Sequence, residues 1–243
     1  MTVSTLGATL AKGQITDQKE KVTFVLVHGA WHGGWCWKKV VPLLESAGHR
    51  VFTPTLTGLG ERAHLLGPQI DLSTHIQDIA AVLEYEDLRN VVLVCHSYAG
   101  MVISGLAEKT RKRLAQLVYF DAFLPENGKS FKDYTPTIPL NELVRKPGVD
   151  SLKALGVTDS ADVAWMLSRL GDQPPKTITQ PVRITADTGK SLRRTFIQTS
   201  QYFTKEAEKA KKQGFRYYEL LSAGHDAMVT KPKELVKIFL ELV

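Results

Sequence analysis

Short apolar runs alternate with longer amphipathic stretches along most of this chain. The runs are continuous and rich in Val, Ile, Leu and Phe, which is typical of strands buried on both faces of a parallel sheet. The expected strands are residues 22–28, 50–56, 90–96, 115–121, 181–186 and 215–221. The expected helices are residues 36–47, 73–85, 98–109, 192–212 and 231–242. Strands that alternate with helices predict an α/β fold, with a mostly parallel six-stranded sheet and helices on both of its faces.

One long stretch departs from this alternation. Residues 123–178 are irregular and partly helical, and they follow the C-terminal end of an expected strand, where ligands bind in open α/β sheets. We therefore expect this insertion to form a lid over a site. The length of 243 residues suits one domain with a full core, which we place at residues 21–243. Residues 1–20 are polar and are expected to form a flexible tail.

Charge, hydropathy and cysteine content indicate which partners and which cellular compartment to expect. The net charge is +6, but the basic residues are scattered and form no stripe with aromatic residues, so we expect no nucleic-acid partner. No apolar stretch is long enough to span a membrane or to form a signal-peptide core. Cys36 and Cys95 are expected to be free thiols in a reducing compartment, which indicates a cytoplasmic protein. The oligomeric state, a homodimer included, is left open by the sequence.

The strand expected at residues 90–96 leads directly into Ser97, and a helical pattern begins almost at once. A serine on such a tight strand-to-helix turn exposes its Oγ, and small neighbours are needed so that strand and helix can approach closely. Cys95 and Ala99 stand where the usual G-x-S-x-G motif has glycines, and both are small. Ser97 is therefore a candidate nucleophile, with an ordinary serine near a helix N-terminus as the alternative.

A glycine-rich loop follows the first expected strand. Residues 28–35 contain three glycines, which let backbone N–H groups face a ligand. In enzymes with a nucleophile elbow, this loop and the residue after the serine each donate one N–H group to an oxyanion. The candidate donors are the amides of Ala30 and Tyr98. The alternative is a plain turn between a strand and a helix.

His225 is the only one of the seven histidines that follows Ser97 in the chain. It lies just after the strand expected at residues 215–221 and before a final amphipathic helix. A histidine on a loop after a late strand is a poor candidate for a core residue, and it is well placed to act as a general base. The order of serine first and histidine last is that of α/β-hydrolases.

Several stretches of the chain resemble the α/β-hydrolase superfamily, and within it the branch of small esterases, plant methyl esterases and hydroxynitrile lyases. The matching stretches are residues 25–37, 54–62, 96–103, 119–125, 158–165 and 224–232. The resemblance implies a serine hydrolase that cleaves small carboxylic esters through a Ser-His-Asp triad, an oxyanion hole and an acyl-enzyme. A serine hydrolase of this kind requires no cofactor. The chain also has no metal-binding pattern such as His-Glu-x-x-His.

The triad acid is where the chain departs from this family. The resemblance puts the acid at Gly189, which has no carboxylate. The alternatives are Asp121, at the end of the strand expected at residues 115–121, and Asp187. We favour Asp121, because a triad requires a carboxylate at the second ring nitrogen of the histidine and not a particular strand. If Asp121 only caps its loop, the serine and histidine would act as a weaker dyad.

The substrate pocket and the reaction have alternatives too. Trp31, Trp165 and Met228 are candidates for an apolar pocket, although such residues more often serve packing. A hydroxynitrile lyase is disfavoured, because the resemblance implies threonine and lysine in that branch where this chain has Gly29 and Asp226. A ligand receptor that has lost turnover is favoured only by the missing acid at its usual place.

Overall fold

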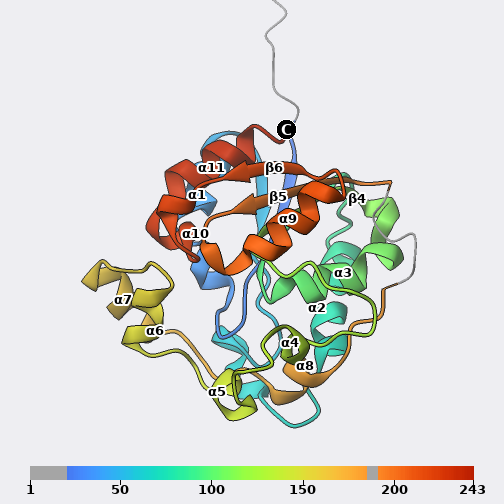
Figure 1. Ribbon diagram of the computed structural model, residues 1–243. Coiled ribbons are helices and arrows are strands. Elements are labelled where there is room, and N and C mark those ends of the chain that lie inside the picture. Colours follow the sequence, from blue (N-terminus) through green and yellow to red (C-terminus); the bar gives the residue numbers. More distant parts are fainter. Residues whose placement is uncertain (1–20, 185–190) are drawn as a thin grey trace, which may run out of the picture.

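The computed structural model describes residues 21–184 and 191–243, and these form a parallel sheet covered by helices (Figure 1). The strand order is β2-β1-β3-β4-β5-β6, and every pairing is parallel. The strands are β1 Thr23–Val27, β2 Arg50–Phe52, β3 Val91–Ser97, β4 Leu114–Ala122, β5 Arg193–Gln198 and β6 Arg216–Glu219. This is the α/β-hydrolase architecture that the resemblance implies.

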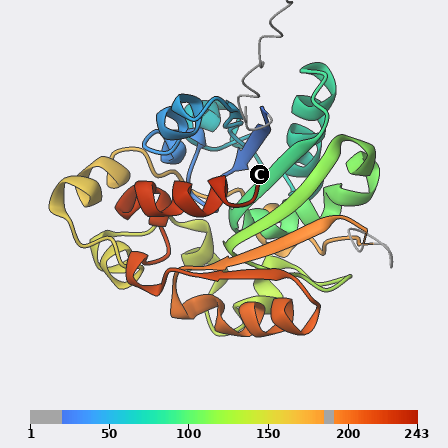
Figure 2. The same cartoon turned by 90° about the horizontal axis from the view of Figure 1, so that it is seen from above.

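Helices cover both faces of the sheet. One apolar core joins the sheet to α2 Leu72–Tyr85, α3 Ala99–Thr110 and α9 Thr204–Lys212. A second core joins the opposite face to α1 Val41–Ser46, α10 Ala227–Thr230 and α11 Pro232–Leu240. In the view from above, β5 and β6 lie between α11 and α9 (Figure 2). Burial on both faces explains why the central strand β3 is apolar along most of its length.

The insertion forms a separate group of short helices below the sheet in the view of Figure 1. These helices are α4 Phe131–Tyr134, α5 Leu140–Val144, α6 Val149–Ala154, α7 Ser160–Leu167 and α8 Pro175–Thr179. A helix leaves the backbone N–H groups of its first turn unpaired, and a polar side chain at its N-terminus can accept them. Asp159, for example, caps α7 through the amides of Ala161 and Asp162. In the part of the chain that the structure describes, no helix is both long and apolar enough to cross a membrane.

The fifth strand differs from the sequence prediction. A strand was expected at residues 181–186, but the described residues 181–184 form no strand. β5 lies instead within residues 192–212, where a helix was expected. Two adjacent arginines obscure the strand pattern of β5, although Phe196 and Ile197 are fully buried. The apolar stretch before it pairs with the loop after β4: the Val182 amide donates to the Lys129 carbonyl over 2.9 Å.

A close contact at the start of α3 sets the position of the β3–α3 corner. A Cβ atom on Gly100 would lie 2.0 Å from the carbonyl oxygen of Phe123, which follows β4. Only glycine therefore lets α3 approach the end of β4 at this distance. The contact brings the corner after β3 and the residues at the end of β4 together.

We predict that Gly100→Ala lowers the free energy of unfolding by about 3 kcal/mol, because the new methyl group meets rigid backbone rather than a flexible side chain. Gly148→Ala is the matched control, since a Cβ there has no atom within 4 Å. It should change stability by less than about 1 kcal/mol. Urea unfolding of both variants measures the difference, and equal stability of the two would contradict the packing argument.

Candidate active site

Ser97 is the last residue of β3 and lies directly before α3. Its φ of 54° is in the left-handed region, which is uncommon for a residue with a side chain. The neighbouring loop approaches closely, because a Cβ atom on Gly29 would lie only 3.0 Å from the Ser97 Cβ. The serine thus occupies the strained strand-to-helix turn that the sequence predicts, in contact with the glycine-rich loop.

Asp121 lies at a β-bulge one strand away. His96 pairs with Phe120 and Ser97 with Ala122, so Asp121 is the extra residue between two registers. Its φ is 41°, and its side chain is completely buried. Bulges re-aim side chains and are common beside active sites. Here the bulge accompanies a carboxylate that lies next to the serine corner at the same end of the sheet.

His225 and Asp121 form a hydrogen bond, with 2.7 Å between the histidine Nδ1 and the aspartate Oδ2. The other carboxylate oxygen, Oδ1, accepts the backbone amides of Thr199 and Ser200 over 2.9 and 3.0 Å. The Ser200 hydroxyl donates to Oδ2 as well. Four donors therefore hold one buried carboxylate, which is the arrangement that a buried charge requires.

Sequence reasoning named His225 as the partner of Asp121, but it missed the other two residues that bind this carboxylate. Thr199 and Ser200 directly follow β5, the strand that the sequence analysis placed too early. Their contact with Asp121 arises because β5 pairs with β4. Asp187 and Gly189, the other acid position and the family's usual one, lie outside the described residues.

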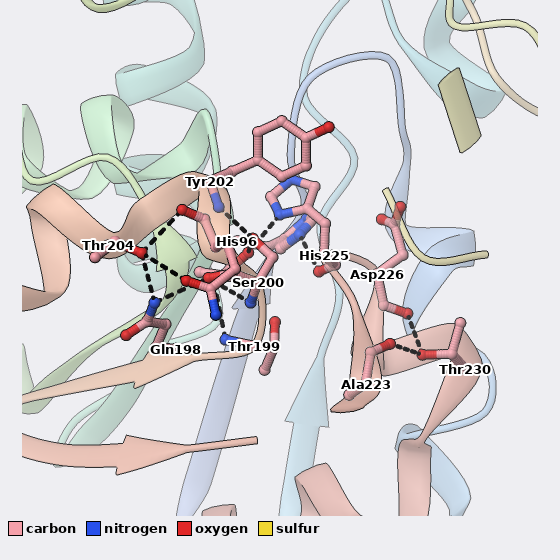
Figure 3. A network of polar contacts seen from close by, with 12 residues as sticks. His96, Gln198, Thr199, Ser200, Tyr202, Thr204, Ala223, His225, Asp226 and Thr230 are labelled. Carbon is pink, nitrogen blue, oxygen red and sulfur yellow. Dashed lines mark hydrogen bonds and ion pairs between the residues drawn. The ribbon is translucent and has the colours of Figure 1, made fainter. Parts of the chain in front are cut away.

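The loop that carries His225 is anchored at several points. The His225 amide donates to the Leu155 carbonyl over 2.8 Å, and the His225 carbonyl accepts from His96 Nε2 over 3.0 Å. The imidazole stacks on Phe203 with 5.4 Å between ring centroids. Figure 3 shows Ser200 and Asp226 on opposite sides of His225. These contacts orient the ring toward Asp121.

Two opposing effects act on the pKa of His225. Burial favours the neutral ring and lowers the pKa, whereas the hydrogen bond and charge of Asp121 raise it, with a further contribution from Asp226. The carboxylates prevail, so the pKa of His225 is raised above the ordinary value of 6.5. The protonated ring is thus stabilised in place.

Asp226 is a second buried carboxylate at the site, and its role was not foreseen. Its Oδ1 lies 3.2 Å from His32 Nε2, and His32 Nδ1 lies 2.7 Å from the Ala30 carbonyl. Burial alone would raise the pKa of Asp226, but His32 and the nearby His225 and His96 hold it well below its usual range. The Ala30 carbonyl needs a donor, so His32 carries its Nδ1 proton. The His32 ring thereby connects the loop after β1 to the loop after β6.

The remaining predicted site residues are the two candidate oxyanion donors and the three candidate pocket residues. Ala30 and Tyr98 are buried, and they follow the neighbouring strands β1 and β3, whose ends pair at Val27 and Cys95. Met228 belongs to α10 and is fully buried in the second apolar core, and Trp165 packs edge-on against Trp35. Trp31 is half-buried and contacts the insertion. A substrate-binding role for the last three stays a prediction.

No group of three or more His, Cys, Asp or Glu residues in the described ranges could hold a metal ion. Cys36 and Cys95 are buried free thiols, and burial raises the pKa of both well above the usual value. Neither cysteine therefore has the thiolate character of a nucleophile.

Comparison with known proteins identifies the family to which this site belongs. A model of the alpha/beta hydrolase family matches residues 24–238. The chain belongs to this family. It is 37% identical over 238 residues to the "Carbendazim hydrolyzing esterase" of Nocardioides sp. (strain SG-4G), covering 88% of this chain and 96% of that protein.

Other esterases of the alpha/beta hydrolase family are also similar. Methylesterase 1 of Arabidopsis thaliana is 37% identical over 127 residues, which cover 48% of this chain and 45% of that protein. The crystal structure of polyneuridine aldehyde esterase, an enzyme of Rauvolfia serpentina, superposes with a TM-score of 0.76 at 22% identity. That alignment covers 92% of this chain and 99% of the other, and it shows the shared fold. The relatives are esterases, and this chain is a carboxylic ester hydrolase.

We predict that NMR titration of the His225 ring gives a pKa above 6.5, and that Asp121→Asn and Asp226→Asn each lower it. Asp121→Asn should have the larger effect, because Asp121 is hydrogen-bonded to the ring. Asp150→Asn on the exposed surface of α6 removes the same charge and should leave the titration unchanged. An unshifted midpoint in both site variants would contradict the electrostatic account.

Proposed function

We propose that this chain hydrolyses small carboxylic esters with Ser97 as nucleophile, His225 as general base and Asp121 as the acid that orients the histidine. The observation that carries the proposal is the 2.7 Å hydrogen bond from His225 Nδ1 to Asp121. Because Nδ1 donates its proton to the carboxylate, Nε2 has a free lone pair for the proton of a hydroxyl group. The left-handed corner at Ser97, which pairs with the residue after Asp121, supports the serine as that hydroxyl.

The reaction proceeds in two halves. The Ser97 Oγ attacks the acyl carbon while its proton passes to His225 Nε2, and the carbonyl oxygen becomes an oxyanion held by the Ala30 and Tyr98 amides. The oxyanion collapses, the bond to the alcohol oxygen breaks, and His225 protonates the leaving alcohol. Water then attacks the acyl-enzyme with His225 as base again, which releases the carboxylic acid and restores Ser97. Two carboxylates near His225 stabilise the imidazolium that forms in each half.

The two alternatives are less well supported. A hydroxynitrile lyase benefits from a positive charge where cyanide leaves, whereas Asp226 is a buried carboxylate whose pKa is held low. A receptor without turnover was favoured by the missing acid at Gly189. The hydrogen bond that His225 donates to Asp121 supports turnover instead, since it gives the histidine an orienting carboxylate.

The relatives suggest which esters to examine first. Carbendazim and methyl esters are the first candidates, because the similar proteins are named for carbendazim hydrolysis and for methylesterase activity. We further propose that the enzyme works in the cytoplasm, without a cofactor or a nucleic-acid partner. A panel of p-nitrophenyl esters of increasing acyl length, tested beside methyl esters and carbendazim, will define the acyl and alcohol preferences.

We predict that Ser97→Ala lowers kcat for p-nitrophenyl acetate by roughly three to six orders of magnitude, the range seen for triad nucleophiles. An organophosphate should label the native protein at Ser97 and leave the variant unlabelled. Ser104→Ala is the matched control, because Ser104 is a buried serine of α3 whose hydroxyl is hydrogen-bonded to the Tyr119 hydroxyl. Retention of activity within tenfold by Ser97→Ala would remove Ser97 from the mechanism.

We predict that Asp121→Asn lowers kcat by about a hundred- to ten-thousand-fold, because an amide favours the wrong tautomer of the histidine. Asp187→Asn should cost less than about tenfold, the effect of a change away from the reacting groups. Steady-state kinetics of the two variants side by side make the comparison. A larger loss in Asp187→Asn than in Asp121→Asn would assign the acid role to Asp187.

A further inference from the structure

Trp31 connects the candidate oxyanion loop to the insertion. Its amide donates to Gln173 Oε1 over 3.0 Å, its indole Nε1 donates to the Leu143 carbonyl over 2.9 Å, and its carbonyl accepts the Gly171 amide over 3.0 Å. Its φ of 66° is left-handed, which is uncommon for a bulky residue. Three hydrogen bonds to the insertion therefore hold a strained backbone next to Ala30.

The peptide group between Ala30 and Trp31 is held at both ends. Its carbonyl oxygen lies 2.7 Å from His32 Nδ1, and its N–H donates to Gln173. This plane sets the direction of the chain immediately after the Ala30 amide, which is the proposed oxyanion donor. If this peptide group rotated, Trp31 could relax from its left-handed backbone conformation. The same rotation would displace the backbone of Ala30. The Trp31 N–H is already paired, so it is not itself a donor to the substrate.

Gln173 is completely buried and has a partner for each end of its amide. Its Oε1 accepts the Trp31 N–H, and its Nε2 donates to the Thr177 hydroxyl over 2.7 Å. Its own backbone amide donates to the Val144 carbonyl. A buried amide with both ends paired keeps one orientation, so Gln173 presents an acceptor to Trp31 and not a donor.

The insertion also packs against the residue after Ser97. The centroids of the Tyr98 and Phe131 rings are 5.8 Å apart, and the Tyr98 hydroxyl lies 3.0 Å from His75 Nδ1. Burial lowers the pKa of His75 to about 4, so its ring is neutral and its Nδ1 can accept the tyrosine proton. A buried chain of hydrogen bonds thus runs from Trp31 through Gln173 and Thr177 to the Pro174 carbonyl, and it holds the residue next to Ala30. The insertion contacts the other proposed donor, Tyr98, through Phe131.

We propose that Gln173 is a positioning residue of the ester hydrolase: it holds the Ala30–Trp31 peptide so that the Ala30 amide meets the oxyanion. This inference rests on the proposed function, because it requires a tetrahedral intermediate at Ser97. Oxyanion donors act only within a narrow range of distance, and a misplacement of about 1 Å can cost roughly a hundredfold in rate. Gln173 acts on the transition state through Trp31 without contacting the substrate.

The first test compares Gln173→Met, which keeps the volume but removes the acceptor, with Gln173→Glu, which keeps an oxygen for the Trp31 amide. Gln173→Met should lower kcat by about ten- to a hundredfold, change KM by less than about threefold, and weaken inhibition by trifluoroacetophenone by the same factor as kcat. That ketone forms a tetrahedral adduct with a serine nucleophile and so reports on the oxyanion contacts. Gln173→Glu should recover most of both losses.

Gln180→Met is the matched control. Gln180 lies just after the insertion and also uses both ends of its amide, but its partner is Ser73 at the start of α2. It should keep native kcat and native inhibitor affinity. The proposal is overturned if Gln173→Met keeps kcat and inhibitor affinity, if Gln180→Met loses as much, or if Gln173→Glu recovers nothing. Gln173→Asn, whose side chain is one methylene shorter, replaces Gln173→Met if that variant does not fold.

Hydrogen exchange gives a readout that does not depend on turnover. Peptides that cover residues 29–33 should exchange faster in Gln173→Met than in the native protein or in Gln180→Met, because the Trp31 amide loses its acceptor. Unchanged exchange would refute the positioning contact even if activity falls. Full activity of Ser97→Ala would instead refute the proposed function, and the exchange result would still show whether Gln173 holds the loop.

Discussion

The hydrogen bond between Asp121 and His225 joins parts of the chain that are 104 residues apart, and the rest of the site is arranged around it. A buried carboxylate is stable only when donors surround it. The chain meets this requirement with the two residues after β5 and with the histidine ring. The β-bulge at Asp121, the pairing of β5 with β4 and the anchoring of the His225 loop all contribute to this one contact.

Two buried carboxylates lie near His225, and each has its own histidine partner. Asp121 contacts one ring nitrogen, and Asp226 lies nearby with His32 as its own partner. Because His32 also contacts the Ala30 carbonyl, one residue affects both the charge near the proposed base and the geometry of the proposed oxyanion loop. In an ester hydrolase this layout favours the imidazolium that forms in the transition state, whereas the positive charge that suits a leaving cyanide is missing from the position after His225.

The insertion is connected through hydrogen bonds to the candidate oxyanion loop. Gln173 holds the residue next to Ala30, and Phe131 packs against Tyr98 on the other side of the proposed oxyanion hole. A left-handed tryptophan costs conformational free energy, which the surrounding hydrogen bonds offset. The insertion and the oxyanion loop are therefore built to adopt their positions together, so that changes in the insertion can affect the rate of reaction as well as the choice of substrate.

The sequence by itself determined the class of fold and five of its six strands, because burial on both faces of a sheet leaves continuous apolar runs that are visible locally. It also identified Ser97 and His225 as candidates, since a tight corner and a loop after a late strand have local signatures. It misplaced β5, where Arg193 and Arg194 hide the strand pattern. Only the tertiary structure decided which groups surround Asp121 and which residue holds Trp31. Such contacts join residues up to 142 positions apart, and a pairing over that distance leaves no periodicity in the sequence.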